Sequence, residues 1–462
     1  MRYLPHTKAD IARMLKVIGV EKVSDLFNVI PAALRCNGCL ELPSALSEPE
    51  ILDRLFELGA QNRAPTRGSG HLVFIGAGIY RHYVPAAVDA LSLRGEFATA
   101  YTPYQPELSQ GTLTAIFEFQ TMVCELYGTE FANASMYDGA SAAAEAMLMS
   151  RRLTRRRKAL VLRSVHPEYI EVCQTYAAGL DEQDDTVHPV AVGDDGMVDL
   201  AALKAALDDD VACVIAQTPN FYGLVEDLAP IAATTHDAGA LLVGVNTETV
   251  ALGLLEPPAA MGADIVVGDG TGLCSQPTLG GPGVGLFGAC GKKALRAMPG
   301  RLVGETVDTA GRPGYVLTLS TREQHIRRDK ATSNICTNHG LYALRFAIHL
   351  SLLGPSGLAR LAQLNLDKAS YAREQLVALD GFEERFGGPT FNEFAIRVPG
   401  GDAQRIVDLA SERGVTPGVS LGRFDPALAD TLLVAVSEVH PKQDIDKLVS
   451  LLGELGNEMR SA

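Results

Sequence analysis

Two polar stretches of the chain carry side chains that could bind a small charged molecule. The segment TAYTPYQPELSQG (99–111) supplies two phenols and an amide beside prolines: Tyr101, Tyr104 and Gln105. The segment TREQHIRRDKATSNICTN (321–338) runs from several arginines into two hydroxyls and an amide: Thr332, Ser333 and Asn334. Such groups can hydrogen-bond a carboxylate or a phosphate, above all at a helix start. The alternatives are a solvated face for the arginines and a helix N-cap for 332–334.

A third candidate lies in SMYDGASAAAEAM, residues 135–147. Gly139, Ala140 and Ser141 stand at an expected helix start, where free amides and a small hydroxyl can hold a phosphate. Asp138 could instead cap a closely packed helix. The residue types leave both interpretations open.

Glycine-rich turns follow two apolar strands but lack the groups that a nucleotide site needs. GAGIYR (76–81) begins like a dinucleotide loop, yet its sixth residue is Arg81, and a tight turn is favoured. GPGVG (281–285) has no acidic residue at the distance that ribose binding requires, which excludes a nicotinamide site. The longer stretch IVVGDGTGLCSQPTLGGPGVG (265–285) contains no lysine, histidine or arginine, and Asp269 is its only acid.

The order of QTPNFYGLVED (217–227), HDAGALLVGVN (236–246) and the 265–285 loop is typical of the large domain of fold-type-I pyridoxal-phosphate enzymes. In those enzymes one strand ends in an aspartate that pairs with the pyridine nitrogen, and a later strand delivers the lysine that binds the aldehyde. Here the place of the aspartate holds Val245 or Asn246, and no lysine occurs between Lys204 and Lys292. We therefore expect this chain alone to be catalytically silent.

Apolar strand-length runs alternate with helical patterns from residue 72 onward, which predicts βαβ units and a mainly parallel sheet covered on both faces. The expected fold is α/β and fold-type-I transferase-like. We predict an N-terminal helical segment (1–70), a large domain (71–345) and a small C-terminal α/β domain (346–462). The boundaries rest on the glycine-rich break near residue 65 and on the change of rhythm after GPSG (354–357).

Composition narrows the classes of partner. The 462 residues carry a formal charge of −15, which argues against nucleic acid or an anionic membrane surface as the main partner. No apolar run approaches the roughly 20 residues of a membrane span, and the N-terminus lacks the apolar core of a signal peptide, so a cytoplasmic location is expected. Cys36 and Cys39 form a lone CxxC without further ligands at suitable spacing, so no metal site is expected.

Several long strings, in their order along the chain, resemble one family. These are RYLPHT, GAGIYRHYVPA, AYTPYQPELSQG, NASMYDGAS, MPGRLVGETVD and TREQHIRRDKATSNICTN. They resemble the glycine cleavage system P protein, and more narrowly subunit 1 (alpha) of its two-subunit bacterial form. The resemblance covers nearly the whole chain. The chain differs from the family's usual sequence in GDGTGLCSQPTLGG and at His339.

The resemblance implies pyridoxal-phosphate-dependent decarboxylation of glycine, with release of CO2 and transfer of the aminomethyl group to the lipoyl arm of the H protein. It implies that a beta subunit of the same fold holds the cofactor covalently, in an α2β2 assembly. By position, Tyr101, Tyr104 and Gln105 would line the substrate pocket, and Thr332, Ser333 and Asn334 would contact the cofactor across the interface. No catalytic residue is implied in this chain itself.

Two other hypotheses remain at this stage. One is a self-sufficient pyridoxal-phosphate enzyme, an aminotransferase or decarboxylase, that uses Lys292 or Lys293, although these lysines follow the glycine-rich loop instead of preceding it. The other is a purely structural partner that supports the beta subunit without lining any site.

Overall fold

The computed structural model describes residues 5–36, 38, 40–62, 70–180, 186–278, 280–333, 335 and 338–461. Its contacts divide the chain into two units, Met1–Ala64 and Pro65–Ala462. Within those described ranges no cluster of three or more His, Cys, Asp or Glu side chains could hold a metal ion. Cys39 of the CxxC lies outside the described residues.

The first unit contains two α-helices, α1 (Lys8–Ile18) and α2 (Glu48–Gly59). Both begin with a capping box, in which a hydroxyl residue and an acidic residue three positions later bond to each other's backbone: Thr7 with Asp10, and Ser47 with Glu50. The 3-10 turns Val23–Phe27 and Ala32–Leu34 lie between the two helices. The described part of the segment 1–70 thus contains two α-helices, and its role as a separate N-terminal segment stays a prediction.

The second unit is built on a seven-stranded sheet in the spatial order β2-β8-β7-β6-β5-β3-β4. Its strands are β2 (Phe131–Ala132), β3 (Lys158–Leu162), β4 (Val187–Val190), β5 (Val211–Gln217), β6 (Leu241–Asn246), β7 (Ile265–Asp269) and β8 (Gly285–Ala289). Strands β3 to β7 run parallel to one another, whereas β8 pairs antiparallel with β7 and with β2. The predicted mainly parallel α/β sheet is confirmed.

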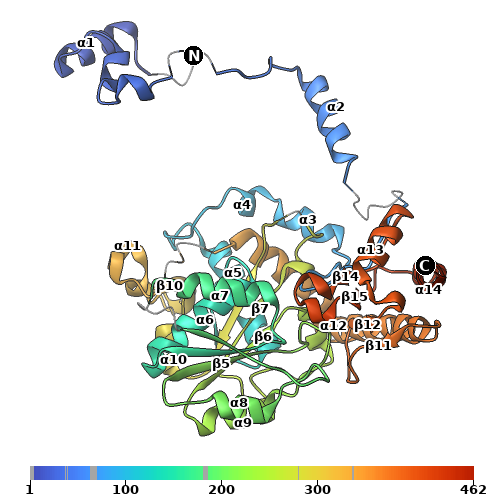
Figure 1. Ribbon diagram of the computed structural model, residues 1–462. Coiled ribbons are helices and arrows are strands. Elements are labelled where there is room, and N and C mark those ends of the chain that lie inside the picture. The colour runs from blue at the N-terminus through green and yellow to red at the C-terminus, as the bar shows by residue number, and fades with distance from the viewer. Residues whose placement is uncertain are drawn as a thin grey trace. The chain divides into compact units, whose positions relative to one another are not determined.

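Helices cover both faces of this sheet. They are α5 (Gln110–Tyr127), α6 (Gly139–Thr154), α7 (Pro167–Ala177), α8 (Leu200–Ala206), α9 (Leu228–Asp237) and α10 (Lys292–Ala297). Helix α6 packs with α7, and α8 packs with α9, on opposite sides of the strands (Figure 1). This arrangement follows from right-handed crossovers that run in opposite directions from the middle of the sheet.

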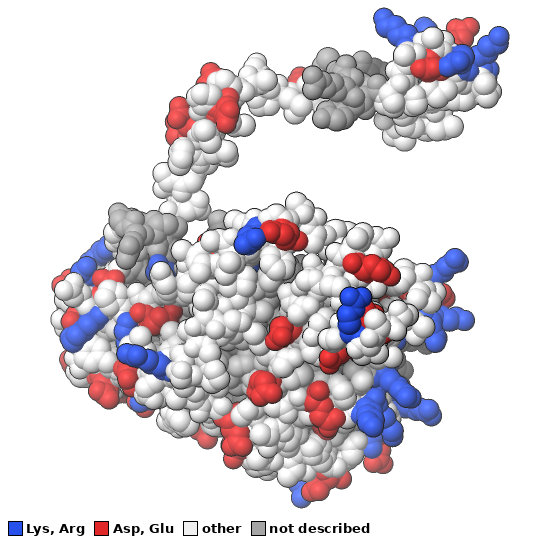
Figure 2. Space-filling view, turned by 180° about the vertical axis from the view of Figure 1, so that it is seen from behind, with Lys and Arg blue, Asp and Glu red and all other residues white. Residues whose placement is uncertain are grey.

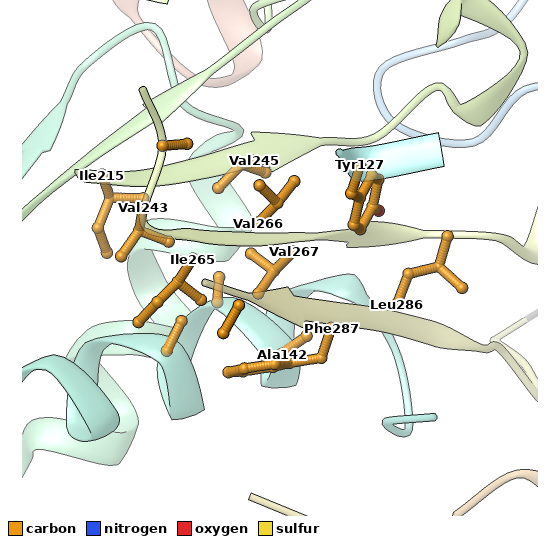
Figure 3. Packing of buried hydrophobic residues seen from close by; sticks show 14 of the residues in the cluster. Tyr127, Ala142, Ile215, Val243, Val245, Ile265, Val266, Val267, Leu286 and Phe287 are labelled. Carbon is orange, nitrogen blue, oxygen red and sulfur yellow. The ribbon is translucent and has the colours of Figure 1, made fainter. Parts of the chain in front are cut away.

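Burial on both faces explains the composition of the central strands. Every residue of β5 and β8 is buried, and the side chains of β6 and β7 are apolar along almost their whole length. Valines and isoleucines of these strands pack against Ala142 of α6 on one side and near Tyr127 of α5, as Figure 3 shows. A strand buried on both faces has no polar alternation, so such runs read as continuously hydrophobic.

The C-terminal part forms a second, smaller sheet in the order β11-β12-β15-β14. Its strands are β11 (Glu383–Glu384), β12 (Glu393–Arg397), β14 (Val419–Ser420) and β15 (Thr431–Ala435). Helices α13 (Ala403–Glu412) and α14 (Lys442–Ser461) pack on it around a separate apolar core that includes Phe394 and Leu448. This is the small α/β architecture expected from the sequence.

The helix α12 (Gly340–Val377) connects the two sheets. It is interrupted at Gly354, whose backbone has φ +60° and ψ 178°, and Pro355 follows directly. Glycine tolerates this conformation and proline cannot continue the hydrogen-bond ladder, so two helical segments meet at an angle there. The predicted change of rhythm after GPSG corresponds to this break.

The remaining elements lie at the edges. They are β1 (Leu72–Val73), α3 (Ala86–Ser92), α4 (Gly95–Ala98), the hairpin of β9 (Leu302–Val307) with β10 (Pro313–Thr318), α11 (Gln324–Arg327) and β13 (Val415–Thr416). The expected strand at 72–76 is reduced to β1, which pairs in parallel with β13 from the C-terminal part.

The surface of the chain carries charges of both signs, interspersed on the face that Figure 2 shows. This agrees with a mixed, net acidic surface, as the formal charge of −15 indicates. Within the described residues, the model contains no helix with the length and apolar character of a membrane span.

Candidate functional site

A cavity of about 320 Å³ lies at the carboxyl ends of the parallel strands. Its wall comes from the ends of β6 and β7, the start of α6, the loop after β7, the segment 78–82 and His339. Carboxyl ends of parallel strands, where neighbouring loops diverge, are the usual binding position in open α/β sheets. The glycine-rich stretch 265–285 therefore does border a cavity.

The start of α6 is occupied by side chains of the chain itself. The carboxylate of Asp138 accepts the backbone N–H of Ser141 at 2.7 Å, which is the helix cap that the sequence offered as one alternative. The backbone N–H of Gly139 donates to Asp269 Oδ2 at 3.3 Å. Asp269 Oδ1 accepts the backbone N–H of Thr271 at 2.8 Å. Two carboxylates of the chain itself thus accept the N–H groups of Gly139 and Ser141 at the start of α6.

The cavity lacks the groups that hold pyridoxal phosphate covalently. No lysine or arginine is among the described residues that line it. At the end of β6, Val245 is buried in the core and Asn246 donates from Nδ2 to the carbonyl of Thr218 at 3.0 Å, so neither supplies a carboxylate to a pyridine nitrogen. Lys292 and Lys293 are exposed at the start of α10, outside the cavity wall. The residues present do not fit a covalently held cofactor.

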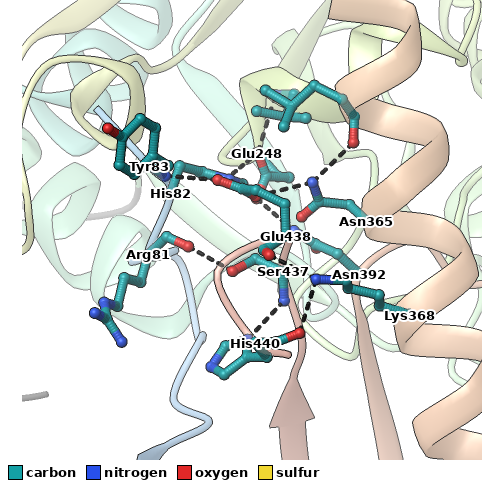
Figure 4. Close-up of polar contacts among 12 residues, drawn as sticks. Arg81, His82, Tyr83, Glu248, Asn365, Lys368, Asn392, Ser437, Glu438 and His440 are labelled. Carbon is teal, nitrogen blue, oxygen red and sulfur yellow. Dashed lines mark hydrogen bonds and ion pairs between the residues drawn. The ribbon is translucent and has the colours of Figure 1, made fainter. Parts of the chain in front are cut away.

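A buried histidine closes one side of the cavity. His82, only 1% exposed, faces two carboxylates: its Nδ1 lies 2.8 Å from Glu438 Oε2 and its Nε2 lies 3.1 Å from Glu248 Oε2 (Figure 4). Both ring nitrogens must donate, so the ring is an imidazolium. Glu248 also accepts from Asn392, and Glu438 accepts from Asn365. This cluster joins the large sheet to α12 and the C-terminal part.

The positive charge of His82 is matched by the carboxylates of Glu248 and Glu438 within the cluster. Burial by itself would lower the pKa of His82, but Glu248 and Glu438 outweigh it and raise that pKa to about 10. Burial would raise the pKa of Glu438, but the hydrogen bond and charge of His82 lower it to about 2. Burial raises the pKa of the neighbouring Glu393 to about 7, against hydrogen bonds from Ala77 and Tyr80 that favour its ionised form.

A second polar region forms around Arg301, which is 4% exposed. Its guanidinium donates to Thr102 Oγ1 at 3.3 Å and to the Tyr104 hydroxyl at 2.9 Å. Arg301 Nε also lies 3.5 Å from Glu323 Oε2. The two polar stretches of the sequence are therefore brought together, through an arginine that lies in neither. We refer to Thr102, Tyr104, Arg301 and Glu323 as the Arg301 cluster.

The residues predicted for the substrate pocket lie beside this cluster and point outward. The Tyr101 side chain is 91% exposed and that of Tyr104 is 54% exposed, although the Tyr104 hydroxyl is bonded to Arg301. Gln105 is also exposed. The Tyr104 ring lies edge-on to that of His325, with centroids 6.0 Å apart. None of these residues lines the cavity at the strand ends.

The residues predicted for cofactor contact lie next to the Arg301 cluster. The backbone N–H of Thr332 donates to the carbonyl of Arg322 at 2.9 Å. The Ser333 hydroxyl donates to Glu145 Oε1 of α6 at 2.7 Å, while Glu145 Oε2 has no partner. Asn334 lies outside the described residues. The N-cap interpretation is wrong for Thr332 and Ser333, because α12 begins only at Gly340.

The solvated-face interpretation of the arginines holds for part of the run. Arg327 and Arg328 are exposed. Arg322 instead donates to the carbonyls of Met298 and Gly300, directly before Arg301. The segment is thereby fixed to the loop that carries the cluster.

Sequence reasoning missed Arg301, Glu145 and His82. Arg301 stands in MPGRLVG, directly before two buried apolar residues, and a lone charge in such a setting is the signal that could have found it. Glu145, in the middle of an alanine-rich helix, gave the same signal. His82 gave no signal, because its two carboxylate partners lie 166 and 356 residues away in the chain.

A family model for the glycine cleavage system P-protein matches residues 1–452. The chain belongs to this family. It is 48% identical over 452 residues to a Sorangium cellulosum protein named "Probable glycine dehydrogenase (decarboxylating) subunit 1", covering 97% of this chain and 98% of that one. A protein of the same name from Caulobacter vibrioides strain NA1000 is 50% identical, over 96% of this chain and 97% of its own length.

Solved structures agree with this relationship. A crystal structure of the glycine decarboxylase P-protein of the glycine cleavage system, in inhibitor-bound form, matches with a TM-score of 0.86 and 42% identity, covering 98% of this chain and all of that one. A Burkholderia pseudomallei sphingosine-1-phosphate lyase matches with a TM-score of 0.68 at 16% identity, over 93% and 95% of the two chains. That similarity concerns the fold alone. The fold-type-I prediction and the family resemblance are confirmed.

Proposed function

We propose that this chain is the alpha subunit of a two-subunit glycine decarboxylase. With a homologous beta subunit that carries the cofactor-binding lysine, it would decarboxylate glycine and pass the aminomethyl group to the lipoyl H protein. An α2β2 assembly is part of this proposal. The matched relatives named "subunit 1" support the two-subunit organisation, since that name implies a second subunit.

One observation supports the assignment of covalent cofactor binding to the beta subunit. The cavity of this chain has no amine in its described wall and holds two carboxylates at the start of α6. An aldehyde has nothing there with which to condense. When bound in the partner, pyridoxal phosphate supplies the electron sink for loss of CO2. This chain would contribute side chains to that pocket and no covalent attachment.

The loop at 101–105 and the segment at 332–334 are the proposed contributions. The loop is supported by exposed tyrosines on a fixed backbone, and the described part of the second segment, Thr332 and Ser333, is supported by its position next to the Arg301 cluster. The Tyr101 phenol is almost fully exposed, while its neighbours Thr102 and Tyr104 are fixed by Arg301. An exposed aromatic side chain on a fixed loop can cover a partner's pocket, exclude water and orient a small carboxylate by hydrogen bonding, at little cost in conformational entropy.

Reconstitution tests the proposal. The purified chain alone should show no covalent attachment of pyridoxal phosphate after borohydride reduction and no glycine–bicarbonate exchange. Exchange should appear when the beta subunit is added. Covalent labelling of the lone chain, with a labelled peptide containing Lys292 or Lys293, would instead establish a self-sufficient enzyme.

Substitutions in the reconstituted complex separate a pocket-lining role from a purely structural one. Tyr101→Ala, and separately Thr332→Ala with Asn334→Ala, should lower exchange by at least tenfold while the subunits still co-purify. Tyr83→Ala is the matched control, because this tyrosine side chain is 65% exposed and lies outside both segments. Unchanged cofactor affinity and turnover in the test variants would favour the structural role.

A further inference from the structure

The contacts of Asp269 suggest why this chain retains a cavity but no cofactor site. Asp269 ends β7 and partly faces the cavity. Its two carboxylate oxygens accept backbone N–H groups from different elements, Gly139 at the start of α6 and Thr271 in the following loop. No described lysine, arginine or histidine forms an ion pair with it. Burial raises the pKa of this carboxyl, while the Thr271 hydroxyl and the backbone N–H groups of Thr271 and Gly139 favour its ionised form.

The start of a helix of this length is a natural position for an anion, because its first amides have no partner within the helix. Helix α6 has 16 residues. The N–H of Ser141 is taken by Asp138 and that of Gly139 by Asp269. A phosphate group would bring a further charge of about −1.5 to −2 next to both carboxylates.

The backbone next to Asp269 is closely packed at Gly139 and Gly268. A Cβ atom added to Gly139 would lie 2.0 Å from the Tyr169 hydroxyl, and one added to Gly268 would lie 2.5 Å from the Tyr127 hydroxyl. The Tyr127 side chain is fully buried and its hydroxyl has no hydrogen-bond partner. Burial, together with the nearby Asp269 carboxylate, raises the pKa of both phenols. Both hydroxyls therefore stay neutral and add no charge next to Asp269.

We propose that Asp269 is an internal anion that occupies the phosphate-binding position at the start of α6 and excludes phosphate esters from this chain's own cavity. Asp269 is thus a specificity-determining residue, and the excluded ligands are a chemical class that includes pyridoxal phosphate. The inference rests on the proposed function insofar as it takes the cofactor to be held by the partner. It adds that removing one charge restores the anion site.

Calorimetric titration of the full-length chain without its partner tests this. The ligands are inorganic phosphate, pyridoxal phosphate and pyridoxal, the last of which lacks only the phosphate. The wild-type chain should bind pyridoxal phosphate no more than twofold better than pyridoxal. Asp269→Asn, which keeps the shape and removes the charge, should prefer pyridoxal phosphate at least tenfold and should bind inorganic phosphate measurably.

Asp227→Asn is the control, because Asp227 also accepts a backbone N–H at a helix start, that of Ala229 in α9 at 3.0 Å, and does not line the cavity. It should gain no phosphate affinity. Asp269→Ser, which retains a small acceptor for the Thr271 N–H, serves as the second variant. Circular dichroism establishes whether each variant is folded.

Equal affinities of Asp269→Asn for pyridoxal phosphate and pyridoxal would overturn the inference, as would a phosphate preference in the wild-type chain. Unfolding of both Asp269 variants would also count against it, since Asp269 would then serve to hold the fold. These outcomes leave the proposed function intact. Covalent attachment of pyridoxal phosphate to the wild-type chain would contradict the proposed function itself.

Discussion

The cavity at the strand ends and the Arg301 cluster are both rich in polar groups, but they use them differently. In the cavity, the carboxylates of Asp138 and Asp269 and the His82 ring are paired with other groups of the same chain. In the Arg301 cluster, a buried guanidinium fixes a loop whose tyrosines face outward. The polar groups of the first region bond to one another, whereas the second region exposes aromatic side chains to solvent.

Under the proposed function, the position that binds the ligand in most folds of this kind is not the one that this chain uses. Carboxyl ends of parallel strands usually bind the ligand. Here the charged side chains at that position are bonded to other groups of the same chain, while the cluster at the edge keeps exposed aromatic side chains. We propose that this cluster is the surface that the chain offers to its partner.

The largest expected effect comes from breaking the His82 cluster. His82→Ala leaves Glu248 and Glu438 buried without their cation, which should cost about 3–5 kcal/mol in the free energy of unfolding. Chemical denaturation of the full chain measures it. His236→Ala is the control, because His236 pairs with Asp264 near the surface and should cost less than about 1 kcal/mol. Similar losses in the two variants would contradict the internal balance inferred for the cavity.

The same cluster predicts a pH dependence of stability. The folded-state pKa of His82, about 10, lies above its unfolded value, so the folded state binds the extra proton. This contribution is fully present below about pH 6.5 and is lost as the pH rises through 10, by at most about 1.4 kcal/mol per pH unit. Denaturation midpoints between pH 7 and 10 should fall in the wild-type chain and fall less steeply in His82→Gln. Parallel profiles would show that His82 is not the titrating group.

In the Arg301 cluster, Arg301→Lys keeps the charge but loses the planar fork that reaches Thr102 and Tyr104 together. We expect glycine–bicarbonate exchange in the reconstituted complex to fall about tenfold, which corresponds to about 1.4 kcal/mol. Arg312→Lys is the control, since Arg312 pairs with Asp308 on the exposed β9–β10 hairpin. Full exchange activity in Arg301→Lys would mean that the loop needs no such anchoring.

The smallest effect is expected for the two lysines after the glycine-rich loop. Lys292→Ala with Lys293→Ala should leave both cofactor content and exchange activity of the complex within about twofold of wild type, because both side chains are exposed and outside the cavity. Absorbance of the bound cofactor and an exchange assay measure the two properties. Loss of bound cofactor in this double variant would support a self-sufficient enzyme that uses one of these lysines.

Much of the fold could be predicted from local patterns. The period of apolar residues in 111–128 corresponds to α5, and the uninterrupted apolar run VACVIAQ is β5, which lies between β6 and β3 inside the sheet. The expected strand at 72–76 is shorter than predicted, because β1 pairs over only two residues with β13. That pairing depends on residues more than 300 positions away, which no local pattern contains.

The candidate site divides in the same way. The sequence alone determined that no lysine lies between Lys204 and Lys292, and therefore that the usual attachment point for an aldehyde is missing, because side-chain chemistry is a property of residue type. Only the tertiary structure decided that Arg301 joins the two polar stretches and that Asp269 reaches the start of α6. Hydrogen bonds and ion pairs act over about 3 Å, so which distant residues share them is set by how the chain packs.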